Sequence, residues 1–152
     1  MLRTGSANYY RGAHEGESEA AFVARRAEEL EALILAEGPD TIAAMIAEPV
    51  SGAGGVIVPP AGYFEAIQAV LDRYGIWLWD DEVICGFGRL GADFGANKLA
   101  MRPQMMTLAK ALSSAYVPIS AAIVQGDIAD CINASATAVS YTHLRAHETH
   151  DD

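Results

Sequence analysis

The sequence predicts an α/β fold with a mostly parallel sheet and flanking helices. Four apolar runs have the length of buried strands, although periodicity alone does not distinguish such runs from buried helix. They occupy residues 41–50, 76–83, 105–112 and 119–126. Amphipathic segments and Gly/Pro-rich loops separate them. Apolar strands joined by such long crossings are typical of a parallel sheet covered on both faces.

Capping residues and apolar spacing predict the helices. Segment 1–17 is polar and Gly-rich, and we expect it to be an incoming loop. A helix runs from Ser18, which can cap its N-terminus, to about Glu37, where Gly38-Pro39 ends it. A second helix covers 63–74 and ends at the glycine that follows.

The composition is that of a globular domain with a core of its own. Of the 152 residues, 51% are hydrophobic, and the formal net charge is -10. Such acidity argues against nucleic-acid binding, which needs clustered lysine and arginine. No apolar run is long enough to span a membrane, and the N-terminus lacks the layout of a signal peptide. The isolated Cys85 and Cys131 fit neither a disulfide framework nor a metal cluster. Together these features lead us to expect a cytoplasmic protein without membrane or nucleic-acid partners.

Three polar residues fall at the ends of predicted strands. Glu48 closes the first run, Asp81 lies late in the second, and Lys110 lies late in the third. Ligands of open parallel sheets bind just beyond the carboxyl ends of the strands. The sequence therefore predicts a ligand site that contains these three side chains.

Lys110 is a candidate nucleophile. It lies between apolar residues in TLAKAL, whereas Lys98, the only other lysine, lies in a polar stretch. A buried amine has a lowered pKa and can attack an aldehyde cofactor to form a Schiff base. The alternative is a structural lysine whose stem is buried and whose ammonium group reaches water or pairs with an acid.

Asp81 is the kind of acid that such a cofactor needs. A pyridoxal ring acts as an electron sink when a carboxylate keeps its ring nitrogen protonated. The alternatives are an ion pair of Asp81 with Lys110 or an arginine, or a helix cap just after the strand. Asp80 and Glu82 alternate to the opposite side of the strand. We expect one of these two to be solvated or paired with an arginine, and we assign them no chemistry.

Three sequence blocks occur in the order and spacing of one enzyme family. They read EPVSGAGGVIVPPAGY (48–63), DEVICGFGR (81–89) and TLAKALSSAYVP (107–118). Lys110 stands 29 residues after Asp81, as the family pattern requires. Over about residues 8–132 the chain resembles the class III pyridoxal-phosphate aminotransferases.

The resemblance implies a role for each site residue. Residues 1–138 would be part of the large, cofactor-binding domain of a fold-type-I transferase. Lys110 would form the internal aldimine with pyridoxal 5'-phosphate and shuttle the proton. Asp81 would pair with the pyridine nitrogen, and Val83 would pack against the ring. Glu48 would be a substrate-gate residue that pairs with a mobile arginine.

The resemblance also implies the reaction. An amino group would move from an amine or amino acid to a keto acid, with pyruvate as the expected acceptor. Ile84 stands where members acting on ornithine or 4-aminobutyrate commonly carry glutamine, which favours the amine–pyruvate (omega-transaminase) branch. A related aminomutase or decarboxylase could share all three blocks. A non-catalytic truncated remnant that acts only by association with a partner also stays open.

Members of this family are homodimers of much longer subunits, so we interpret the chain as an internal fragment. By the resemblance, the turn that holds the cofactor phosphate, the aromatic residue that stacks on the ring, and the small domain lie outside it. We therefore expect this chain to be inactive alone and its sheet to have an exposed edge.

The last segment, 139–152, is interpreted as a non-native tail. It reads VSYTHLRAHETHDD and resembles an adaptor-derived run that ends many unrelated translations. The spacing of His143, His147, Glu148 and His150 could pass for a helical metal site. We reject that interpretation and predict no metal.

Overall fold

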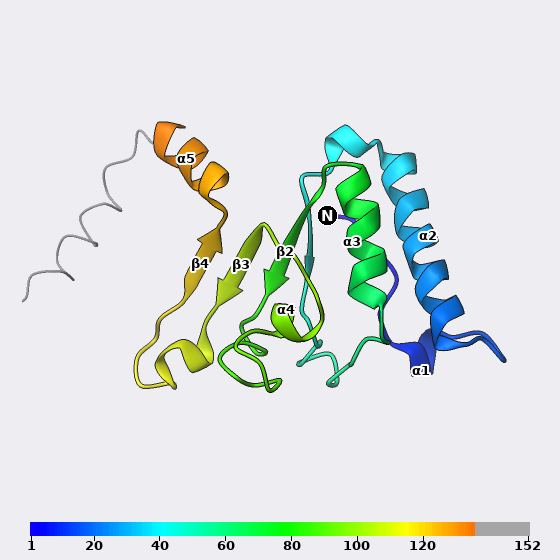
Figure 1. The fold of residues 1–152 in the computed structure, drawn as a ribbon, viewed down its shortest axis with the longest axis horizontal. Coiled ribbons are helices and arrows are strands. Elements are labelled where there is room, and N and C mark those ends of the chain that lie inside the picture. The colour runs from blue at the N-terminus through cyan, green and yellow to red at the C-terminus, as the bar shows by residue number, and fades with distance from the viewer. Residues whose placement is uncertain (136–152) are drawn as a thin grey trace, which may run out of the picture.

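A computed structural model describes residues 1–135, which form one four-stranded sheet with helices (Figure 1). The strands are β1 (Ala44–Ala47), β2 (Trp77–Asp81), β3 (Met105–Leu108) and β4 (Ala121–Val124), in the spatial order β1-β2-β3-β4. The first three are parallel, and β4 runs antiparallel to β3. The predicted α/β fold with a mostly parallel sheet is therefore confirmed. The predicted tail, 139–152, lies outside the described residues.

β4 reverses direction because of the connection that precedes it. A parallel neighbour needs a crossover that carries the chain back along the sheet, usually through a helix. Between β3 and β4 the chain forms only the short 3-10 helix η2 (Lys110–Ser113) and a turn. The chain thus re-enters the sheet beside the end of β3 where it left, and β4 runs back along β3 in the opposite direction.

Helix α2 (Glu19–Glu37) begins and ends where the sequence predicts. The Ser18 hydroxyl accepts a hydrogen bond from the N–H of Ala21, and Gly38 ends the helix at a φ of 90° that favours glycine. The chain continues into η1 (Pro39–Thr41). Helix α3 (Tyr63–Arg73) also matches its prediction. Both helices are therefore readable from their capping residues.

Three further helices are short. They are α1 (Tyr9–Gly12), α4 (Gly95–Lys98) and α5 (Gly126–Ser135). α1 lies within the segment expected to be a loop, where Asn8 caps it by accepting the N–H of Arg11. In the described part of the chain, no helix is long and apolar enough to cross a membrane.

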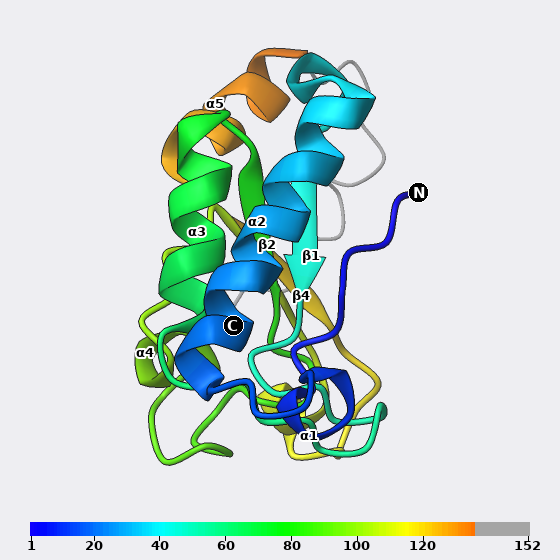
Figure 2. The same cartoon turned by 90° about the vertical axis from the view of Figure 1, so that its right-hand side faces the viewer.

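The core lies between the sheet and the pair α2–α3, which run side by side in front of the strands in Figure 2. Apolar side chains from both helices and from β2 fill it. The buried members are Phe22, Val23, Leu30, Ile34, Tyr63, Phe64, Ile67, Val70, Leu71, Ile76, Leu78, Ala96 and Met101. Burying them supplies the main stabilising free energy of the fold.

The opposite face of the sheet is open in the described part of the chain. Ile46 is 56% exposed and Trp77 40%. The expectation of a sheet covered on both faces is therefore wrong for these residues. α2 and α3 lie on the same side of the sheet, and the link from β2 to β3 contains only the one-turn helix α4. Residues 1–135 therefore leave no long helix to cover the second face.

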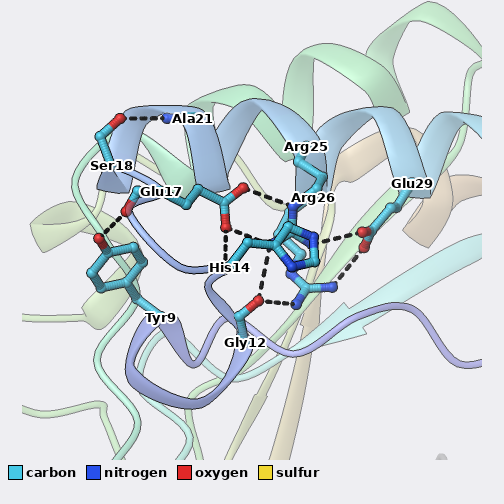
Figure 3. Close-up of polar contacts among 9 residues, drawn as sticks. All are labelled: Tyr9, Gly12, His14, Glu17, Ser18, Ala21, Arg25, Arg26 and Glu29. Carbon is cyan, nitrogen blue, oxygen red and sulfur yellow. Dashed lines mark hydrogen bonds and ion pairs between the residues drawn. The ribbon is translucent and has the colours of Figure 1, made fainter.

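A network of ion pairs and hydrogen bonds connects the N-terminal segment to α2 (Figure 3). The guanidinium of Arg25 donates to Glu17 at 2.6 Å, to the carbonyl of Gly12 at 2.9 Å and to Glu29 at 2.8 Å. Arg26 donates to Glu29 at 2.6 Å and stacks on the Phe22 ring, 4.8 Å from its centroid. Hydrogen bonding to Arg25 lowers the pKa of Glu17 to about 2.

Candidate active site

Glu48, Asp81 and Lys110 lie at one edge of the sheet. β1, β2 and β3 point the same way in Figure 1, so their carboxyl ends share that edge. Glu48 follows the last residue of β1, Asp81 is the last residue of β2, and Lys110 follows β3 by two residues. β2 and β3 are adjacent, and Asp81 is the register partner of Thr107. The topology thus brings the three predicted residues to the edge where ligands of such sheets bind.

Asp81 is half-buried, and it ends its strand with a local hydrogen bond. Its Oδ1 accepts the N–H of Val83 at 3.1 Å, which turns the chain away from the sheet. It lies on the open face, because side chains alternate along the strand and Trp77 is exposed there. No ion pair between Asp81 and any lysine or arginine is found in the described residues. The alternative of a structural ion pair therefore does not account for this carboxylate.

Lys110 is exposed in the described part of the chain, which corrects the expectation of a buried amine. The apolar residues that flank it in sequence do not enclose it, because the chain leaves the sheet after Leu108 and turns into η2. Lys110 begins this turn with a φ of 47°, in the left-handed region that is costly for a non-glycine residue. Ser114 and Ala115 follow with φ of 51° and 65°. Such strain is concentrated at functional sites in many proteins.

Glu48 is held by the loop that follows it. Its Oε2 accepts the N–H of Gly52 at 2.9 Å, and its Oε1 accepts the hydroxyl of Ser51 at 3.1 Å. Gly52 also packs against the loop that follows β2, since a Cβ at Gly52 would lie 2.5 Å from Cδ1 of Ile84. Glu48 borders a pocket of about 200 Å³ that Thr4 and the N-terminal segment help to line. The carboxylate is therefore held in place beside this pocket.

Asp80 and Glu82 are both fully buried, so the expectation that one of them is solvated or paired with an arginine is wrong. They point to the same side of the strand as Leu78, toward the helices. Burial, together with the neighbouring Glu82 carboxylate, raises the pKa of Asp80 to about 8. Strand alternation in the sequence puts both residues on the same side as Leu78, but it does not say that the helices cover this side.

Cys85 is a buried, hydrogen-bonded thiol. It donates to the carbonyl of Val50 at 3.3 Å, and burial raises its pKa. A raised pKa leaves little thiolate near neutral pH, so Cys85 is a poor nucleophile. Its expected role as a small apolar side chain fits this environment.

Comparison with known proteins identifies the family. The profile described as Aminotransferase class-III matches residues 6–143, and the chain belongs to this family. It is 52% identical over 144 residues to gamma aminobutyrate transaminase 1, mitochondrial, of Solanum lycopersicum, which covers 94% of this chain and 28% of that protein. It is 54% identical over 132 residues to gamma aminobutyrate transaminase 3, chloroplastic, of the same species, covering 87% and 25%.

Solved structures agree on the fold. A transaminase with L-ala superposes with a TM-score of 0.85 at 54% identity, covering 87% of this chain and 31% of that one. An omega transaminase from Pseudomonas jessenii in complex with PMP superposes with a TM-score of 0.84 at 52% identity, covering 88% and 30%. The chain thus spans less than a third of the length of these relatives. The predicted family and fold class are confirmed, whereas the roles of individual site residues stay predictions.

Proposed function

We propose that this chain provides the cofactor-binding core of a pyridoxal-phosphate-dependent aminotransferase, which moves an amino group from an amine or amino acid to a keto acid. The observation that carries the proposal is the placement of Asp81 and Lys110 at the carboxyl ends of adjacent parallel strands. Membership of the class III family and the likeness to a transaminase in complex with PMP support it.

The residues present fit a cofactor with a cationic ring nitrogen and an aldehyde. Asp81 is a half-buried carboxylate without a cationic partner among the described residues, and such a charge needs a positive group beside it. The side chain of Lys110 is exposed, and its amine forms no ion pair with any of residues 1–135. The pair therefore offers a charge partner for one end of the cofactor and a nucleophile for the other.

Each residue then has one task. When bound, the cofactor supplies an electron sink that labilises a proton on the substrate carbon. Asp81 would hold the proton on the ring nitrogen while its Oδ1 stays bonded to Val83. Val83 would pack against the ring. The amine of Lys110 would bind the aldehyde carbon and later move the proton at the substrate carbon.

Glu48 is proposed as the gate residue. Its carboxylate lies at the same edge of the sheet and accepts hydrogen bonds from Ser51 and Gly52, which orient it without neutralising its charge. An arginine of the whole protein could pair with it while the site exchanges substrates. Glu48→Gln would remove the charge but keep an oxygen for the N–H of Gly52, while its NH2 group could donate to the Ser51 hydroxyl. It should therefore alter the substrate preference and leave the fold intact.

The substrates are proposed to be an amine donor and pyruvate, in a homodimer. Ile84 favours the amine–pyruvate branch, and one similar solved protein is a transaminase with L-ala. The similar plant proteins are gamma-aminobutyrate transaminases, so 4-aminobutyrate is the first alternative donor to assay beside a simple amine. A cytoplasmic location stays our proposal, although those two relatives are named mitochondrial and chloroplastic.

Borohydride trapping tests the proposal. The protein is incubated with pyridoxal 5'-phosphate and reduced with borohydride, and the labelled peptide is mapped. We expect a pyridoxyl group on Lys110 and none in Lys110→Ala, with Lys98→Ala as the matched control that keeps the label. A label confined to Lys98, or no label, would contradict the site assignment.

A further inference from the structure

The carboxyl groups of Asp80 and Glu82 are enclosed by this chain alone. Both side chains have 0% exposure among the described residues, so a ligand or a further segment could reach them only by displacing residues that cover them. Asp80 belongs to β2 and Glu82 follows the strand directly, so they lie one on each side of Asp81 in the sequence and point to the helix-facing side. Their partners must therefore come from the atoms that surround them.

Those surroundings supply one hydrogen-bond donor. Oε1 of Glu82 accepts the N–H of Ala96 at 2.8 Å, at the start of α4. Oε2 of Glu82 and both carboxylate oxygens of Asp80 have no partner in the described part of the chain. Two buried anions two residues apart, with three oxygens unsatisfied, would be strongly unfavourable in a low-dielectric interior.

No positive group among the described residues offsets these charges. The other titratable groups nearby are Asp81 on the same strand and the Cys85 thiol in the loop after it, and Glu48 from the turn after β1 also acts on Cys85. On α3, which packs against β2, the buried polar side chains are Tyr63 and Gln68. Gln68 bonds the backbone of residue 102 with both ends of its amide. The described residues also include no cluster of three acidic, histidine or cysteine side chains that could hold a metal ion.

We propose that Asp80 and Glu82 bind one shared proton, with the neutral carboxyl of Asp80 donating to Oε2 of the Glu82 carboxylate. The proton is taken from water on folding, and no other bond forms or breaks. The charge resides on Glu82 because its Oε1 accepts the amide of Ala96, which stabilises the ionised form. A single charge-assisted hydrogen bond then engages Oε2 of Glu82 and one of the two Asp80 oxygens.

The pair is a clasp that positions the end of β2. Through Ala96 it joins this strand to α4, and at Gly95 a Cβ would come within 3.2 Å of Oε1 of Glu82 and 2.6 Å of Cβ of Pro49. The turn after β1, the end of β2 and the start of α4 thus meet at one point. Asp81 lies between the two members of the clasp, so its placement depends on them.

The clasp makes stability depend on pH in a defined direction. Burial, and then the Glu82 charge, raises the pKa of Asp80 from 3.8 to about 8. Between these values the folded protein holds a proton that the unfolded chain has released, so the stability that the proton supplies is lost as pH rises. The loss begins near pH 4 and is complete above about pH 8.

Asp80→Asn tests the proposal, since its amide can still donate to Glu82 but cannot titrate. As pH rises from 4 to 8, we expect the urea midpoint of the wild type to fall relative to that of the variant. The infrared spectrum of the wild type minus that of the variant at pH 7 should contain a carboxylic-acid C=O band, because the variant has no carboxyl group at position 80. Asp130→Asn, exposed on α5, is the matched control and should change neither measurement. Parallel midpoint curves, or no acid band in the wild type at pH 7, would overturn the proposal.

A second variant decides the matter if Asp80→Asn does not fold. Glu82→Gln keeps an oxygen for the N–H of Ala96 and removes the charge that holds the proton on Asp80. The acid band should then disappear at a lower pH than in the wild type. An unchanged titration of this band would show that the two carboxyl groups do not share a proton.

Discussion

At the scale of single residues, Asp81 combines a structural hydrogen bond with a proposed chemical role. Asparagine at this position keeps an oxygen for the N–H of Val83 but loses the charge that would hold a proton on the cofactor ring. In the whole protein we expect Asp81→Asn to retain cofactor on Lys110 and to slow amino transfer by about 100-fold to 1,000-fold. Stopped-flow absorbance of the first half-reaction with an amine donor measures this rate.

Asp93→Asn is the control for Asp81, because Asp93 is exposed in the loop that follows. It should transfer amino groups at the wild-type rate. If Asp81→Asn also did so, the carboxylate would have no part in holding the ring proton. Failure to retain the cofactor would instead indicate that Asp81 serves mainly in binding.

Glu17 carries a second residue-scale prediction, on acid stability. Its bond to Arg25 lowers its pKa from 4.5 to about 2, so the folded state releases a proton that the unfolded chain keeps between these values. The stability it supplies is present above pH 4.5 and is lost as pH falls toward 2. Glu17→Gln should unfold at lower urea than the wild type at pH 7, and the difference should vanish near pH 2. Glu15→Gln, exposed in the same segment, should match the wild type throughout.

At the scale of elements, the sequence predicted the long helices well and the environments of the charged residues poorly. Ser18 and Gly38 mark the ends of α2 because capping is a local interaction that any reader of the chain can recognise. The exposure of Lys110 depends on a left-handed turn after β3, and the apolar residues next to it in the sequence do not predict that turn. The burial of Asp80 and Glu82 depends on which face α3 covers, which is a tertiary property.

The junction of the β1 turn with α4 gives an element-scale prediction. Gly95 is buried, and a Cβ there would lie 2.6 Å from Cβ and 2.7 Å from Cγ of Pro49. Gly95→Ala should therefore lower the free energy of unfolding by about 1–3 kcal/mol through overpacking. Urea unfolding measures the change. Gly126→Ala is the matched control, since nothing lies within 4 Å of its added methyl group, and equal effects of the two substitutions would remove the packing explanation.

At the scale of the whole molecule, the described residues form a sheet with helices α2 and α3 on one face and no long helix on the other. α2 and α3 pack on the first, whereas apolar side chains on β1 and β2 are exposed on the second. β1 and β4 are also the edge strands of the described sheet. The chain spans less than a third of the length of its relatives. Its own surface thus combines two features, an apolar patch and an unpaired strand edge, that favour association.

This surface predicts that the isolated chain associates through its open face. Ile46, 56% exposed on the edge strand β1, is the side chain where a charge should act most directly. We expect Ile46→Lys to lower concentration-dependent light scattering, because a lysine on an edge strand opposes pairing with another chain. Its free energy of unfolding should stay within about 0.5 kcal/mol of the wild type, since the site is exposed. Leu35→Lys adds the same charge at a residue of α2 that is 58% exposed and should leave the scattering unchanged. An equal decrease in both variants would mean that net charge, rather than the open sheet face, governs association.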